Sequence, residues 1–126
     1  YVKCSEEELS KDLYMNLKQV KELKSNGFTI GGHGHSSLEF SELTNHEQQV
    51  EIKNNYQFLK SINENIKTIS YPNGSYNENS LMLLGKNKFD LAFITNDVGF
   101  NSLKNINPLL INRIDASQND LLKLSK

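Results

Sequence analysis

Segments with the spacing of amphipathic helices alternate along this chain with short β-prone runs. Helices are expected at about residues 6–25, from 45 to about 62, and 78–84, and strands at 28–30, 66–71, 91–94 and 109–111. This alternation constrains the fold, because strands that are connected through helices pair in parallel with right-handed crossovers. The predicted order is helix, strand, helix, strand, helix, strand, loop, strand, helix, and the predicted fold class is α/β.

Two capping boxes predict where the longer helices begin. Ser5 with Glu8, and Thr44 with Glu47, each place a hydroxyl three residues before a glutamate, so that the two side chains can bind the N–H groups of the first turn. The first helix has a point near Asn16 where it can break.

Chain length and charge exclude several classes of protein. A chain of 126 residues suits one domain, and its net charge of -1, with no basic tract, disfavours a nucleic-acid binder. Its apolar runs are far shorter than the roughly 20 residues that span a bilayer, so no membrane-spanning segment is expected. The single cysteine, Cys4, excludes an intrachain disulfide and a zinc site built from cysteines.

Unusual polar residues follow each predicted strand. They are His33 and His35 after the first strand, Tyr71-Pro72-Asn73-Gly74 after the second, Asn96-Asp97 after the third, and Arg113 with Asp115 after the fourth. The carboxyl ends of parallel strands meet at one edge of a sheet, where ligands bind in α/β proteins. We therefore expect a functional site at this edge.

The two histidines of the first loop have two interpretations. His33 and His35 are two residues apart, so in an extended segment their imidazoles project to the same side and can share a cation. Alternatively, one histidine binds loop carbonyls and the other is solvated. A catalytic zinc site has three protein ligands, so two histidines do not complete one.

Three segments, taken in order, resemble the polysaccharide deacetylase family. They are GFTIGGHGHSS at residues 27–37, SYPNGSY at 70–76, and residues 107–115, with Asn107-Pro108-Leu109 and Asn112-Arg113-Ile114-Asp115. The resemblance covers most of the chain and implies a distorted (β/α) barrel. Residues 1–126 are then a single domain, the C-terminal part of such a barrel, without its N-terminal strands.

The family removes acetyl groups from N-acetylated sugars with a metal-bound water. The resemblance therefore implies that residues of the first loop are ligands of a metal ion. His33 matches the first ligand of a motif with histidines four residues apart, whereas Ser37 stands where the second histidine is expected. His35 can substitute through a shift of register. The implied cofactor is a divalent metal, zinc, held weakly or not at all, because serine is a poor zinc ligand. The family's Asp-Asp motif, which supplies a third ligand and the catalytic base, does not occur here, and the chain is expected to begin after it.

The resemblance also implies substrate-binding and catalytic residues. The substrate-binding residues are Tyr71, Pro72, Asn73 and Gly74, which match the family's groove motif, except that Ser70 stands in place of its arginine. Tyr71 is expected to line the groove, with its backbone N–H near the oxyanion. The family's acid histidine has no match, and Arg113 is its implied counterpart, with Asp115 as the second catalytic residue.

The implied partner is an N-acetylated polysaccharide or oligosaccharide. We expect the 126-residue chain alone to be inactive and to self-associate through an open sheet edge. The alternative is a non-catalytic module of the same origin that binds glycan or supports polysaccharide assembly, and a third interpretation is an unrelated α/β fragment.

Overall fold

The computed structural model describes residues 5–65, 67–95 and 106–113. The chain divides into two compact units, Tyr1–Ile30 and Gly31–Lys126. The expectation that they belong to a single domain of a larger barrel stays a prediction.

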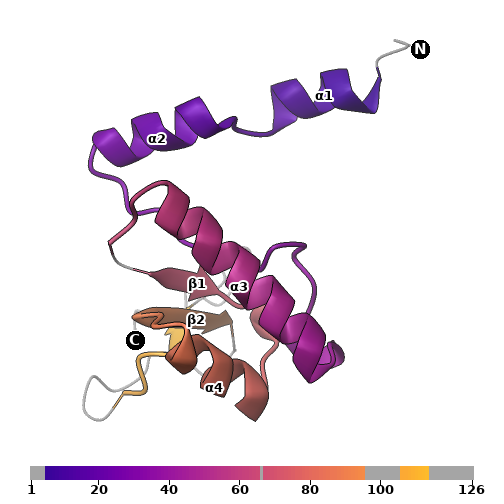
Figure 1. The fold of residues 1–126 in the computed structure, drawn as a ribbon, viewed down its shortest axis with the longest axis vertical. Helices are drawn as coiled ribbons and strands as arrows, with labels where there is room; N and C mark the ends of the chain where they lie inside the picture. The colour runs from indigo at the N-terminus through magenta and orange to yellow at the C-terminus, as the bar shows by residue number, and fades with distance from the viewer. Residues whose placement is uncertain (1–4, 66, 96–105, 114–126) are drawn as a thin grey trace, which may run out of the picture. The chain divides into compact units, whose positions relative to one another are not determined.

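The first unit contains two helices where the sequence predicts one that can break. Helix α1 spans Glu6–Leu13 and helix α2 spans Leu17–Ser25 (Figure 1). The break comes at the expected place, because Asn16 is extended and its side chain accepts the N–H of Gln19 to cap α2.

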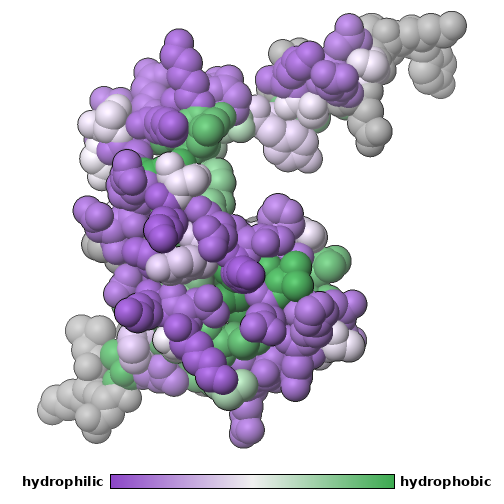
Figure 2. All heavy atoms as spheres, viewed as in Figure 1, coloured by the Kyte–Doolittle hydropathy of each residue, from purple (hydrophilic) through white to green (hydrophobic). Residues whose placement is uncertain are grey.

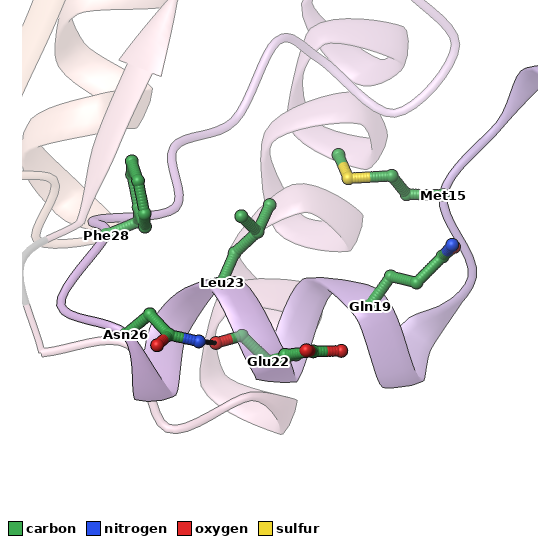
Figure 3. A pocket seen from close by; sticks show the side chains of 6 residues that line it. All are labelled: Met15, Gln19, Glu22, Leu23, Asn26 and Phe28. Atoms are coloured by element: carbon green, nitrogen blue, oxygen red, sulfur yellow. Dashed lines mark hydrogen bonds between the residues drawn. The ribbon is translucent and has the colours of Figure 1, made fainter.

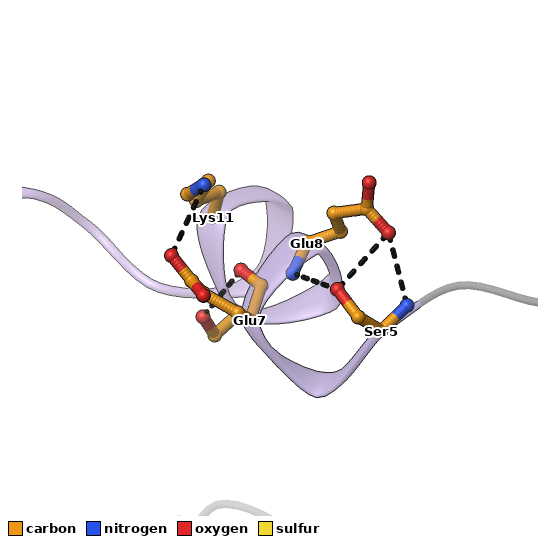
Figure 4. Close-up of polar contacts among 5 residues, drawn as sticks. Ser5, Glu7, Glu8 and Lys11 are labelled. Atoms are coloured by element: carbon orange, nitrogen blue, oxygen red, sulfur yellow. Dashed lines mark hydrogen bonds and ion pairs between the residues drawn. The ribbon is translucent and has the colours of Figure 1, made fainter.

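The capping box of α1 forms as its sequence predicts. Ser5 Oγ accepts the backbone N–H of Glu8, and Glu8 Oε2 accepts the Ser5 N–H at 3.0 Å (Figure 4). One turn later, Lys11 Nζ lies 3.5 Å from Glu7 Oε1, on an exposed face where such pairs contribute little. Local hydrogen bonds therefore define this end of the helix.

The segment after α2 is not the strand that its β-prone residues predict. Gly27 adopts a φ of +88°, and the Phe28 N–H donates to Leu23 O, which closes the end of α2. The Phe28 side chain is 60% exposed. The predicted strand at 28–30 is thus wrong, and strand pairing in this region is reduced to a single parallel bridge between Gly32 and Ile69.

The second unit is built on a parallel sheet in the order β1-β2-β3 (Figure 1). The strands are β1 at Thr68–Ser70, β2 at Leu91–Thr95 and β3 at Ile111–Arg113. Ile69 pairs with Ala92, and Phe93 pairs with Ile111. The sheet is open among the described residues, which confirms the α/β class and is consistent with part of a distorted barrel.

Helices alternate with these strands. The 3-10 turn η1 at Phe40–Glu42 and helix α3 at Asn45–Ser61 precede β1, and the 3-10 turn η2 at Pro72–Gly74 and helix α4 at Glu78–Lys86 connect β1 to β2. Strand β3 begins two residues later than expected, because Pro108 and Leu109 form a turn. The last predicted helix lies outside the described residues.

The core of the second unit lies between the sheet and helices α3 and α4. Its buried apolar side chains are Phe40, Ile52, Leu59, Ile62, Ile69, Tyr71, Leu83, Leu84, Phe89, Ala92 and Ile94. The outward surface of α3 is mostly hydrophilic, as Figure 2 shows. Among the described residues, no helix combines the length and the apolar character needed to cross a membrane.

Candidate functional site

The carboxyl edge of the sheet brings together most of the predicted site residues. Gly32 bridges to Ile69, so His33 follows it at the level of Ser70, where β1 ends. The turn of η2 continues directly from β1, and Arg113 ends β3 beside Thr95, the last residue of β2. Segments far apart in the sequence therefore meet here, as parallel strands require.

His33 has a defined ring orientation. Its Nδ1 lies 3.0 Å from the backbone oxygen of Ser70. A carbonyl oxygen only accepts hydrogen bonds, so Nδ1 carries the proton of the neutral ring and Nε2 keeps a lone pair. Hydrogen bonds from the Gly32 N–H to Thr68 O and from the Ser70 N–H to Gly32 O, both 2.8 Å, anchor the preceding backbone. The exposed His33 ring thus presents Nε2 as an acceptor or ligand atom.

His35 and Ser37 lie in the same exposed loop as His33. The backbone N–H of His35 donates to Glu51 Oε2, and Ser37 adopts a left-handed φ of +56°. No group of three His, Cys, Asp or Glu side chains that could hold one ion occurs among the described residues. Because a catalytic zinc takes three protein ligands, these residues alone do not fit such a site. His33 fits one ligand position, because its Nδ1–H is already donated to a backbone carbonyl, as is usual for metal-bound histidines.

Glu51 and Asn55 lie beneath this loop, and none of the sequence motifs points to them. Both are buried on α3, and both bind loop backbone. Their spacing in the sequence could have identified them. Glu51 and Asn55 recur with the helical period of the buried Ile52 and Leu59, which places both polar side chains on the inner face of α3.

Tyr71 belongs to the core more than to an open groove. Its side chain is fully buried, its hydroxyl donates to Leu109 O, and its ring packs edge-on against Phe40. Burial, with a smaller effect of Tyr76, raises the pKa of Tyr71 well above its usual value. The Tyr71 backbone N–H donates to Phe93 O at 3.0 Å, so it could reach an oxyanion only by leaving the sheet.

The rest of the turn at residues 72–74 is partly exposed. Pro72 is buried, whereas Asn73 is exposed with a φ of +51° and donates through Nδ2 to Glu39 Oε1 at 2.7 Å. Gly74 has a φ of +71°, and a Cβ there would lie 2.8 Å from Thr95 O. Glycine is therefore required where the turn packs on the end of β2.

Arg113 extends over the neighbouring strand at this edge. Its Nη2 donates to Thr95 Oγ1 at 3.4 Å, and its guanidinium lies 5.9 Å from the centre of the Phe93 ring. The guanidinium stays protonated at working pH, so Arg113 can stabilise negative charge but cannot act as a base. Asp115, Asn96 and Asp97 lie outside the described residues.

A separate hollow lies in the first unit. Figure 3 shows Leu23 of α2 on the same side of the helix as Met15 and Phe28, which belong to the segments just before and just after α2, and Gln19, Glu22 and Asn26 complete the lining of the hollow. No predicted site residue lines this hollow.

Comparisons with known proteins agree on one family. Residues 8–92 match the family described as polysaccharide deacetylase. The Bacillus subtilis protein named "Putative polysaccharide deacetylase YxkH" is 29% identical over 83 residues, which are 65% of this chain and 30% of that protein. The structure of the Streptococcus pyogenes deacetylase PplD in complex with acetate is similar, with a TM-score of 0.74 and 30% identity over 85% of this chain and 47% of that one. The chain thus spans less than half the length of either protein.

Proposed function

Because the chain belongs to the polysaccharide deacetylase family, we propose that it contributes to the hydrolysis of N-acetyl groups on a polysaccharide or oligosaccharide. The observation that carries the proposal is the presentation of His33 Nε2 at the carboxyl edge of a parallel sheet. In this reaction water adds to the acetamide carbonyl, the C–N bond breaks, and the products are an amine and acetate. The similar structure of the Streptococcus pyogenes deacetylase contains acetate, which is the carboxylate product of this reaction.

The proposed roles follow the chemistry of the side chains. His33 Nε2 offers a lone pair, and Arg113 supplies a fixed positive charge that stabilises the developing oxyanion. Asp115 is the second proposed catalytic residue. Tyr71, Pro72, Asn73 and Gly74 form the proposed sugar-binding turn, in which Asn73 and its partner Glu39 offer exposed polar groups to hydroxyls.

The proposed cofactor is a divalent metal, zinc, with His33, His35 and Ser37 as its candidate ligands in this chain. When bound, such an ion supplies an activated water and polarises the carbonyl. The described residues do not complete a three-ligand site, and a serine hydroxyl is a weak donor beside imidazole. We therefore propose that the 126-residue chain holds zinc weakly and does not hydrolyse acetamides by itself.

A second candidate function is favoured by the same incomplete ligand set. In it, the chain is a glycan-binding or polysaccharide-assembly module that keeps the family's fold without turnover. The two candidates differ in whether acetate is released, and they share the expectation that sugar binds along the turn at 71–74.

Acetate release from N-acetylglucosamine oligomers tests the proposal. With zinc or cobalt added, residues 1–126 should release no measurable acetate, because the chain lacks the aspartate pair and the acid histidine. A longer chain that carries an upstream Asp-Asp motif should release acetate, and His33→Ala should abolish this activity. His46→Ala is the matched control, because His46 is an exposed residue of α3 outside the loop.

Three outcomes would change the assignment. Acetate release by residues 1–126 that is lost in His33→Ala would show that the site is complete without further ligands. A longer chain that gains activity only with Ser37→His would show that the serine had silenced the site. If the longer chain with Ser37→His is also inactive while it still binds the oligomers, the protein is a glycan-binding module and not an enzyme.

A further inference from the structure

Helix α3 presents two buried polar side chains to the loop that carries His33. Glu51 is 6% exposed and Asn55 is 7% exposed, and they lie one turn apart on the buried face of α3, which they share with Gln48, Ile52 and Leu59. Buried polar groups cost stability unless they are hydrogen-bonded, so their partners indicate what they do.

Glu51 binds the backbone of the loop with one carboxylate oxygen. Its Oε2 accepts the N–H of His35 at 2.6 Å and the N–H of Ser36 at 2.7 Å. Hydrogen bonds to a carboxylate are stronger than those between neutral groups. The loop reaches this arrangement through Gly34, whose φ is +73° and where a Cβ would lie 3.2 Å from Glu51 Oε2.

Asn55 binds the same loop one turn further along α3. Its Nδ2 donates to Gly34 O at 2.7 Å, and this bond fixes which end of the amide carries the oxygen. The Oδ1 atom is buried, has no hydrogen-bond partner among the residues that the structure describes, and faces Gly32, where a Cβ would overlap it. Gly32 can therefore lie this close to Asn55 only because it has no side chain.

His33 lies between two anchored segments of backbone. On one side, Gly32 pairs with Thr68 and Ser70 of β1, and on the other side Glu51 and Asn55 hold residues 34–36. With both ends fixed, the ring stays against Ser70 O, which selects the Nδ1–H tautomer. An imidazole that is released from this carbonyl would sample both tautomers and would not present Nε2 steadily.

We propose that Glu51 and Asn55 are positioning residues that set the direction and tautomer of the His33 ring. The meaning of this role for catalysis rests on the proposed function, whereas the role itself is a property of the chain without metal or sugar. Glu51 and Asn55 act through the loop backbone and do not touch the reacting atoms.

Nuclear magnetic resonance of the 126-residue chain tests this role directly. The ring nitrogen shifts of His33, measured without metal or sugar at a pH of about 8.5, report the tautomer of the neutral imidazole. Hydrogen exchange of the His35 and Ser36 amides reports the bonds to Glu51. Asn54→Ala is the matched control for Asn55→Ala, and Glu78→Gln on the exposed first turn of α4 is the control for Glu51→Gln.

Glu51→Ala should speed exchange of the two amides by about tenfold or more, because bonds to a charged acceptor are lost. Glu51→Ala and Asn55→Ala should each convert the His33 signal from the Nδ1–H tautomer to a mixture. Glu51→Gln keeps an acceptor oxygen without the charge, so it should keep the Nδ1–H tautomer while its amides exchange about threefold faster or more. Both control variants should match the wild type.

The role is overturned if folded Glu51→Ala and Asn55→Ala chains keep the Nδ1–H tautomer, or if wild-type His33 lacks it. If the alanine variants do not fold, Glu51→Gln decides, because amide exchange equal to that of the wild type would show that the carboxylate does not hold the loop. No substrate enters these measurements, so a chain that proves not to be part of a deacetylase still gives a clear result.

Discussion

Replacing Gly32 with alanine should destabilise the second unit and release the His33 loop. The new Cβ would overlap Asn55 Oδ1 and lie 2.7 Å from Asn55 Cγ, so the amide of Asn55 has to move. Moving it breaks the bond from Asn55 Nδ2 to Gly34 O. Overpacking typically costs about 1–3 kcal/mol and a lost hydrogen bond about 0.5–1.5 kcal/mol, so Gly32→Ala should lower the free energy of unfolding by about 2–4 kcal/mol.

Urea denaturation of a double-mutant cycle separates the clash from other effects. Asn55→Ala alone loses the bond to Gly34 and should cost about 1–2 kcal/mol. In Gly32→Ala/Asn55→Ala the obstacle is gone, so the double variant should be no more than about 0.5 kcal/mol less stable than Asn55→Ala alone. The coupling free energy between the two sites should then be about 2 kcal/mol, within the range for residues in contact.

Gly85→Ala provides the matched control for adding a methyl group. Gly85 lies within α4, and a Cβ there meets nothing within 4 Å, so this substitution should stabilise the chain by about 0.5–1 kcal/mol. Two results would refute the close approach of Gly32 to α3. One is a loss of less than about 0.5 kcal/mol in the free energy of unfolding for Gly32→Ala, and the other is a double variant whose loss equals the sum of the losses in Gly32→Ala and Asn55→Ala.

Three further measurements bear on the metal, the sheet edges and the helix caps. Calorimetry should find weak zinc binding that is lost in His33→Ala and in His35→Ala, and sub-micromolar affinity that survives His33→Ala would place the site elsewhere. Because an open sheet edge favours association, sedimentation should show self-association or a poorly stable chain, whereas a monodisperse monomer with a cooperative melt would contradict this expectation. Hydrogen bonds from the Thr44 hydroxyl and backbone lower the pKa of Glu47 below its usual value near 4.5. A lowered folded-state pKa gives stability that is present above the unfolded pKa, so this contribution should be lost as pH falls below about 4.5 through the folded pKa. Glu47→Gln should remove this part of the acid dependence of the urea midpoint, and parallel profiles for the two chains below that pH would argue against it.

The sequence alone determined the features that depend on near neighbours. The capping boxes at Ser5 and Thr44 place the starts of α1 and α3 at Glu6 and Asn45, and Asn16 marks the break before α2. These signals are readable because a helix cap joins residues three positions apart. The apolar run at 91–94 likewise predicts β2, and the ordered motifs identify the family.

Tertiary structure decided how the candidate site is assembled. Tyr71 packs into the core although its motif suggests a groove. Glu51 and the loop at His35 are 16 residues apart, and His33 and Ser70 are 37 apart. Local propensity carries no information about such pairs, because which backbone groups the buried Glu51 carboxylate and the exposed His33 imidazole meet is fixed only when α3 packs over the sheet and brings those segments together.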